Sequence, residues 1–344
     1  MRKETRLAFN AYLEKLVRLN GVPSVTEKFT VTPSVQQRLE SNIQESSAFL
    51  QAINIMGVSE QQGAKLGLGV GSTIASTTDT TSADRVPTDP TALDEGGYNC
   101  TQTNYDTAIR YAKLDAWAKF PNFQTMIRDA IVKRQALDRM VIGFNGTSRA
   151  ATSDRTTNPL LQDVNIGWLQ KYRAGAAARV MAEGNTADSD EVRIGAAAGH
   201  DYVNLDALVF DVVASLIEPW YRADPGLVVI LGRDLLHDKY FPLVNQVQAA
   251  TETLATDIII SQKRVGGLQA VSVPYFPDGT LMVTTYDNLS IYYQDGARRR
   301  TVVDNAKRDQ IENYESSNDA YVVEDYGRGC VVENIVQTWA APGG

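Results

Sequence analysis

The stretch NFQTMIRDAIVKRQALDRMVIGF, residues 122 to 144, decides the fold of this 344-residue chain. Its apolar side chains recur every three or four positions, and it contains no proline and no glycine before Gly143. This spacing predicts one amphipathic helix, which at 1.5 Å per residue would be about 34 Å long. The turn sequence Asn145-Gly146 ends it. We therefore expect one long helix here.

Two more helices are expected upstream. One runs from about Glu4 to Leu19 and carries an apolar stripe, so it either packs on its own domain or binds a partner. The other begins with Thr32 as N-cap and Pro33 at the first helical position and continues to Ile53. Its apolar stripe is narrow, which predicts a helix lying on a surface rather than inside a core.

An α/β block is expected downstream. Leu205 to Tyr221 and Arg233 to Gln246 are predicted helices, and residues 227–232 between them are a predicted buried strand. Further runs of strand length and strand pattern follow at 270–276, 280–286, 289–294 and 311–336. Upstream of this block, residues 104–120 also show strand alternation. The expected fold class is α+β.

Composition and charge limit the function. With 43% hydrophobic and 22% charged residues the chain is typical of a globular protein, and no segment approaches the ~20 apolar residues of a membrane span. The N-terminus lacks the apolar core of a secretory signal, which predicts a protein that stays in the cytoplasm of the cell that makes it. Residues 1–28 carry a net charge of +3, whereas the remainder carries −11. An acidic body argues against general nucleic-acid binding.

A glycine-rich stretch, KLGLGVGSTIASTTDTTSADR at residues 65–85, raises the question of a phosphate site. A P-loop needs Lys and then Ser or Thr directly after its last glycine. Here Gly71 is followed by Ser72, with no lysine between them. A dinucleotide site needs Gly-x-Gly-x-x-Gly before a helix, whereas Gly67, Gly69 and Gly71 alternate and lead into Ser/Thr-rich sequence. The pattern favours a flexible or closely packed hairpin.

No residue is nominated for catalysis, for cofactor binding or for a metal. The chain lacks a Gly-x-Ser-x-Gly elbow, and His200 and His237 stand in no catalytic motif. HExxH and CxxC are absent, and the two cysteines, Cys100 and Cys330, predict reduced thiols. The run Arg298 to Arg300 is interpreted as a charged surface or an intersubunit salt bridge. A hydrolase with a pair of carboxylates stays open, because such pairs follow no spacing rule.

Several long stretches of this sequence resemble one family of proteins. The chain is similar to the major capsid proteins of temperate, contractile-tailed phages of the peduovirus group, which have the tailed-phage Hong Kong ninety-seven fold. The matching stretches are RKETRLAFNAYL (2–13), KFTVTPSV (28–35), GSTIASTTDT (71–80), FNGTSRAATSDR with NPLLQDVNIGWLQKYR (144–173), LIEPWY (216–221), DKYFPLVN (238–245), ISQKRVGGLQAVSVPYFP (260–277), NLSIYYQD (288–295) and ENYESSNDAYVVEDYGRGC (312–330).

The resemblance implies a division of the chain into parts. In order these are a basic N-terminal segment (1–29), an N-terminal arm (30–56), an extended loop (57–104), a peripheral domain with the spine helix at 122–144 and an insertion (105–199), an axial domain (200–305), and strands that return to the peripheral domain with a C-terminal tail (306–344). The glycines Gly67, Gly69 and Gly71 would then lie on a finger that crosses a neighbouring subunit.

The resemblance also implies a function and partners. The chain would assemble with itself into hexamers and pentamers of an icosahedral virion shell that encloses double-stranded DNA without sequence-specific binding. An internal scaffolding protein, a maturation protease and a portal protein would act with it. The protease would cut between Phe29 and Thr30 and release the basic segment. An encapsulin-like compartment shell and a hydrolase are the alternatives.

Overall fold

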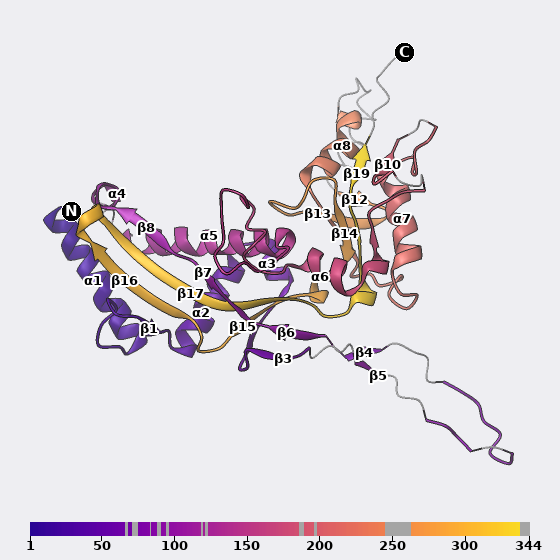
Figure 1. Cartoon of the computed structure of the whole chain (residues 1–344), viewed down its shortest axis with the longest axis horizontal. Helices are drawn as coiled ribbons and strands as arrows, with labels where there is room; N and C mark the ends of the chain where they lie inside the picture. Colours follow the sequence, from indigo (N-terminus) through magenta and orange to yellow (C-terminus); the bar gives the residue numbers. More distant parts are fainter. Residues whose placement is uncertain are drawn as a thin grey trace, which may run out of the picture.

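The computed structural model describes most of the chain. The described residues are 1–65, 68–70, 75–82, 84–87, 91–93, 96–117, 120, 123–185, 189–195, 198–244 and 263–337. Figure 1 shows an elongated molecule with a sheet at each end: a long curved sheet beside the N-terminus and an upright sheet near the C-terminus. A hairpin finger projects from the region between them.

The long sheet has seven strands organised around β17, which runs from Gln310 to Val323. The first half of β17 pairs with β16 and β8, and its second half pairs with β15 and β7. β2 adds to β15 in parallel, and β1 adds to β16. The other strands are β1 (Phe29–Thr30), β2 (Asn54–Val58), β7 (Thr101–Asn104), β8 (Thr107–Arg110), β15 (Leu289–Gln294) and β16 (Arg299–Asn305).

The upright sheet has six strands in the order β12-β13-β11-β14-β18-β9, packed against α7 (Leu205–Leu216) and α8 (Arg233–Val244). Its strands are β9 (Val180–Met181), β11 (Val228–Leu231), β12 (Arg264–Val265), β13 (Leu268–Ser272), β14 (Leu281–Thr284) and β18 (Cys330–Val332). Successive side chains of a strand point to opposite faces. Val229 and Leu231 accordingly enter the core beneath α7, while Val228 and Ile230 enter the central core on the other face.

The predicted long helix is confirmed as α5, Phe123–Asn145. Its last turns are buried on every side, because α2, α3 and α6 (Trp168–Gly175) surround them. Gly143 permits the close approach of α6, since a Cβ there would lie 2.3 Å from Cζ3 of Trp168. The helix therefore joins the core of one sheet to that of the other.

The helix expected over residues 32–53 is wrong in two respects. It is broken into α2 (Pro33–Glu45) and α3 (Ala48–Ala52), because Ser46 ends the first helix and its hydroxyl donates to the carbonyl of Ile43. The expected start, with Thr32 as N-cap and Pro33 after it, is confirmed. The pair also does not stay outside the core: Gln37, Arg38 and Ser41 on its outer face are exposed, but Ile43 and Leu50 are fully buried in the central core.

Three boundaries also differ from the sequence expectation. The strand expected through residue 120 ends at Arg110, where α4 (Tyr111–Trp117) begins. The helix expected to reach Tyr221 ends at Leu216, because a residue before proline, here Glu218 before Pro219, disfavours helical geometry. The third boundary is that of the domains implied by the resemblance. Residues 289–305, implied for the axial domain, pair within the long sheet, whereas β9 and β18, implied for the peripheral domain, pair within the upright sheet. The α+β class is confirmed.

Candidate functional site

The finger is one hairpin that contains two short two-stranded sheets and extends away from the body (Figure 1). β3 (Gln62–Ala64) pairs with β6 (Gly97–Asn99), and β4 (Leu68–Val70) pairs with β5 (Thr91–Leu93). Gly69 lies in β4 opposite Ala92, while Gly67 and Gly71 lie outside the described residues. Beyond β4, residues 75–82 and 84–87 are all exposed. The described part of the finger thus presents its surface to solvent or to another molecule.

The basic N-terminal segment is packed on its own chain. Helix α1 (Lys3–Asn20) buries Phe9 and Leu16 in an apolar cluster with residues of α4, α5, β16 and β17. Polar contacts fix its orientation: Arg6 forms an ion pair with Asp304, and Nη2 of Arg300 donates to the Tyr12 hydroxyl at 2.9 Å. Of the two interpretations of this helix, packing on its own domain describes this structure.

The expected processing position lies inside that packed region. Phe29 and Thr30 form β1 and pair with Arg300 and Arg299 of β16. Phe29 is 8% exposed, and its neighbours in the cluster, Val25 and Val31, are buried too. A protease needs an extended, accessible segment, so cleavage between Phe29 and Thr30 requires β1 to leave β16. The position itself stays a prediction.

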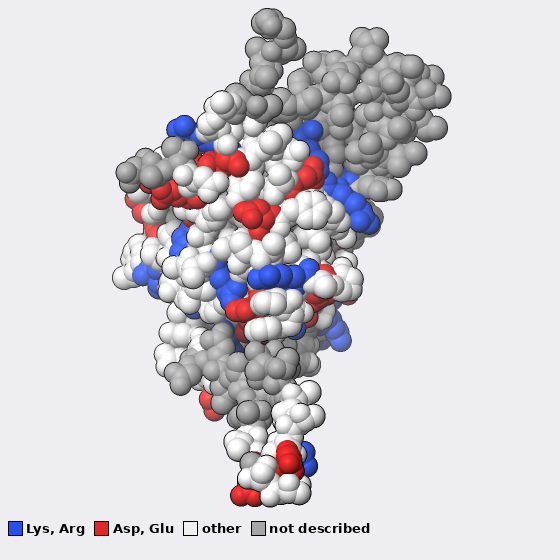
Figure 2. All heavy atoms as spheres, turned by 90° about the vertical axis from the view of Figure 1, so that its right-hand side faces the viewer, with Lys and Arg blue, Asp and Glu red and all other residues white. Residues whose placement is uncertain are grey.

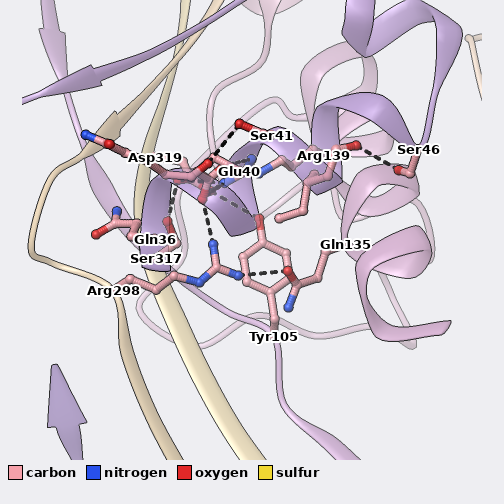
Figure 3. Close-up of polar contacts among 12 residues, drawn as sticks. Gln36, Glu40, Ser41, Ser46, Tyr105, Gln135, Arg139, Arg298, Ser317 and Asp319 are labelled. Atoms are coloured by element: carbon pink, nitrogen blue, oxygen red, sulfur yellow. Dashed lines mark hydrogen bonds and ion pairs between the residues drawn. The ribbon is translucent and has the colours of Figure 1, made fainter. Parts of the chain in front are cut away.

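A buried charge cluster connects the N-terminal arm to the centre of the fold (Figure 3). The carboxylate of Glu40 on α2 binds two guanidinium groups, that of Arg139 on α5 and that of Arg298 just before β16. Nη1 of Arg298 lies 2.6 Å from Oε1 of Glu40, and its Nη2 lies 2.6 Å from Oε1 of Glu315. Nη2 of Arg139 lies 3.3 Å from Oδ1 of Asp319. The cluster therefore joins α2, α5 and the long sheet at one point.

Each carboxylate of this cluster lies beside an arginine, so the buried charges offset one another. Three carboxylates meet Arg139 and Arg298, and the partly buried Arg300 also acts on Glu315. Burial alone would raise the pKa of the Glu315 carboxyl, but Arg298 and Arg300 outweigh burial and hold that pKa below its ordinary value. In the same way, Asp319 and Glu40 overcome burial and raise the pKa of Arg139.

The cluster corrects the interpretation of residues 298–300 as a charged surface for Arg298, whereas Arg299 is exposed and Arg300 is partly buried. Arg298 is fully buried and pairs within its own chain. A signal for it exists in the sequence, because Gln36 and Glu40 on α2, and Gln135 and Arg139 on α5, are four residues apart and share a helix face. All four are buried. Polar residues at helical spacing along the inner face of a helix indicate such a cluster.

The groups considered for chemistry are placed apart. His237 is exposed on α8, and His200 lies in the loop before α7. Cys100 and Cys330 are fully buried, and burial raises the pKa of each thiol to about 12, which keeps the thiols protonated. Within the described ranges, no three His, Cys, Asp or Glu residues gather as metal ligands would. In the same ranges every helix is too short or too polar to span a bilayer.

One face of the molecule can be read for charge in Figure 2. On this face, which carries the end of the upright sheet, acidic and basic side chains are interspersed among the residues drawn in colour. Nucleic-acid-binding surfaces gather Lys and Arg in a patch or stripe. The described residues on this face form no such patch.

The sequence is similar to those of phage capsid proteins over nearly its whole length. The sequence pattern of the family described as "Phage major capsid protein, P2 family" matches residues 8–335. The chain is 55% identical to the "Capsid proteins" of Escherichia phage P2, over 97% of this chain and 95% of that one. It is 41% identical to the "Major capsid protein" of Serratia phage KSP20, over 99% of both.

A solved structure agrees with these sequence matches. A chain of the "Satellite phage P4 procapsid including size determination (Sid) protein" superposes with a TM-score of 0.82 at 53% identity. The match covers 98% of this chain and 99% of that one. It therefore includes both sheets and the connections between them.

Proposed function

The chain belongs to the P2 family of phage major capsid proteins, and on that basis we propose how its parts work within the shell. It is a structural subunit with the tailed-phage Hong Kong ninety-seven fold, it assembles with further copies of itself, and its place is the capsid of the virion. The family is one of capsid proteins and not of enzymes, and it fits the peduovirus group. Neither a compartment shell nor a hydrolase gains support.

We propose that the upright sheet with α7 and α8 is the core of the axial domain, which meets other copies at the centres of hexamers and pentamers. The long sheet with α5 would be the peripheral domain, and residues 57–104 would be the extended loop. Support comes from the core that the upright sheet forms with α7 and α8, to which the long sheet contributes no residue, and from the finger, whose exposed tip leaves the body of its own chain. Elements that bury nothing on their own chain need neighbours.

We further propose that the glycines of the finger, which have no side-chain carbon, let it lie close against the neighbouring subunit. Gly69 leaves the face of β4 on which it lies without a side chain, and Gly67 and Gly71 alternate with it in the sequence. Such a face can approach another backbone closely. It can also bend if the shell expands during maturation.

We propose a maturation step at the N-terminus with partners from the phage. An internal scaffolding protein would engage the basic helix α1 during assembly, and a maturation protease would then cut between Phe29 and Thr30. A portal protein would occupy one vertex, and the shell would enclose DNA without reading its sequence. The separate basic charge of residues 1–28 and the acidic remainder support this division.

The observation that carries the function is the family match over nearly the whole chain. Its test is electron microscopy of the expressed protein, first alone and then with the scaffolding protein encoded by the same phage. We expect closed icosahedral shells. A product that stays monomeric under both conditions would contradict the function.

A further inference from the structure

A cavity of about 580 Å³ lies in the body of the chain where α6, β17 and β6 meet (Figure 1). Among the described residues that line it, Arg149 and Lys171 carry positive charge and none is a carboxylate. The other lining residues are uncharged, and three of them, Gln62, Asn99 and Asn165, have side-chain amides. The cavity is thus positively charged in a chain whose formal net charge is −8.

Lys171 on α6 is half-buried and has no counter-ion in the described part of the chain. Its ammonium group makes no hydrogen bond or ion pair with the described residues. Burial, and then the positive charge of nearby Lys65, lower the pKa of this group. Because an ammonium group held partly out of water costs free energy unless it is paired, a negative charge beside Lys171 would be stabilising.

Arg149 supplies a second positive group, from the loop that follows α5. Its Nη1 donates to the carbonyl oxygen of Val164 at 2.7 Å, and no carboxylate among the described residues pairs with its guanidinium. A guanidinium group has five N–H donors. One bond to a carbonyl oxygen therefore positions the side chain and leaves further donors for water or for a ligand.

Neutral donors complete the lining of the cavity. Oγ1 of Thr101 is shielded from solvent and makes no hydrogen bond to the described residues. A buried polar group costs free energy as long as it is unpaired. Hydroxyl groups and side-chain amides can both donate to an oxygen atom. The lining therefore matches an anion with several acceptor oxygens, whereas a cation would meet only like charge.

We propose that this cavity binds a small inorganic oxyanion of the phosphate type, held between the ammonium group of Lys171 and the guanidinium group of Arg149. Lysine acts on such an ion as a point charge, and arginine offers a planar fork of donors. The cavity is larger than the ion, so the ion enters with part of its water. The site lies within one chain, and the inference does not depend on the proposed function.

Titration of the full-length chain with sodium phosphate, followed by phosphorus NMR at constant ionic strength, tests the site. We expect saturable binding. Lys171→Gln should weaken it about tenfold or more, because a charge-assisted hydrogen bond is lost, and Arg149→Gln should weaken it several-fold. Lys171→Arg keeps the charge and should retain most of the affinity. Lys307→Gln is the matched control and should bind as the wild type does, because Lys307 is exposed and lies outside the cavity.

Protection of the lysine from acetylation gives a second readout that needs no variant. The lowered pKa leaves more of Lys171 as the free amine, which is the form that reacts with an acetylating reagent. Mass spectrometry should show that saturating phosphate slows the acetylation of Lys171 several-fold relative to chloride. The exposed Lys307 should react equally in both salts.

Three outcomes would overturn the site. Phosphate that neither binds the wild type in a saturable manner nor protects Lys171 would exclude it. Equal loss of affinity in Lys171→Gln and Lys307→Gln would show general screening of surface charge. Because DNA carries phosphate groups too, a short DNA duplex is titrated in parallel, and binding of the duplex through Lys171 without binding of the free ion would assign the cavity to nucleic acid. The capsid function is tested separately, by the microscopy of the shells.

Discussion

Nη1 of Arg298 lies 2.6 Å from Oε1 of Glu40, although 258 residues separate the two in the sequence. The contact ties α2 of the N-terminal arm to the turn that precedes β16, and both side chains are buried. Arg139 holds the other carboxylate oxygen of Glu40 from α5. One carboxylate therefore fixes the arm to both the long helix and the long sheet.

Removing this carboxylate should destabilise the fold. Glu40→Gln leaves Arg139 and Arg298 buried with less compensating charge, and the loss of one partner of a buried ion pair costs about 3–5 kcal/mol. The measurement is the free energy of unfolding from urea titration. Glu45→Gln is the control, because Glu45 is exposed near the end of the same helix. Equal stability of the two variants would show that the cluster does not hold the arm.

The same cluster predicts a dependence of stability on pH. The pKa of Glu315 is lowered in the fold from an ordinary value of 4.5. Its contribution to the free energy of unfolding is therefore complete well above pH 4.5 and is lost as pH falls through the lowered pKa. Glu315→Gln should flatten the fall in stability between pH 5 and pH 3, measured by urea titration. An unchanged slope would assign the acid sensitivity to other carboxylates.

Substitution of glycine by valine should have different effects in the finger and in α5. Gly69→Val, and by the sequence pattern Gly67→Val, should leave thermal unfolding of the monomer unchanged but reduce shell formation or expansion, because the finger is outside the cores. Gly143→Val should lower the unfolding temperature, since its Cβ would meet Trp168. Calorimetry and particle counts separate the two effects. Normal particles from both finger variants would show that those glycines are incidental.

Processing between Phe29 and Thr30 should be slow while β1 is paired with β16. Phe9→Ala removes an aromatic ring from the cluster that holds α1 and the Phe29 side chain, so it should raise the rate of cleavage several-fold. The measurement is the time course of cleavage by the maturation protease, with N-terminal sequencing of the product. Leu7→Ala is the control, because Leu7 is exposed on the same helix. Mature particles that still begin at Met1 would refute this step.

The elements with strong local signals could be predicted from the sequence. The long apolar stripe gave α5 to within one residue at each end, and the run LSIYYQ gave β15 with its observed bounds. Both follow from the spacing of apolar residues within one element, which needs no knowledge of its neighbours.

The buried polar contacts could not be predicted in the same way. Gln36 and Glu40 made α2 look like a surface helix, because the partners that neutralise Glu40 lie 99 and 258 residues away. A cavity of about 580 Å³ at the root of the finger depends likewise on β6, α6 and β17 meeting in space. Long-range pairing of this kind becomes visible only when the fold brings the segments together.

A cryo-electron-microscopy map of the assembled shell tests the central claim most directly. The account predicts a closed icosahedral particle in which the finger, residues 57–104, of each subunit lies against the next subunit. A map in which the finger contacts only its own chain, or a protein that forms no particle, would contradict it.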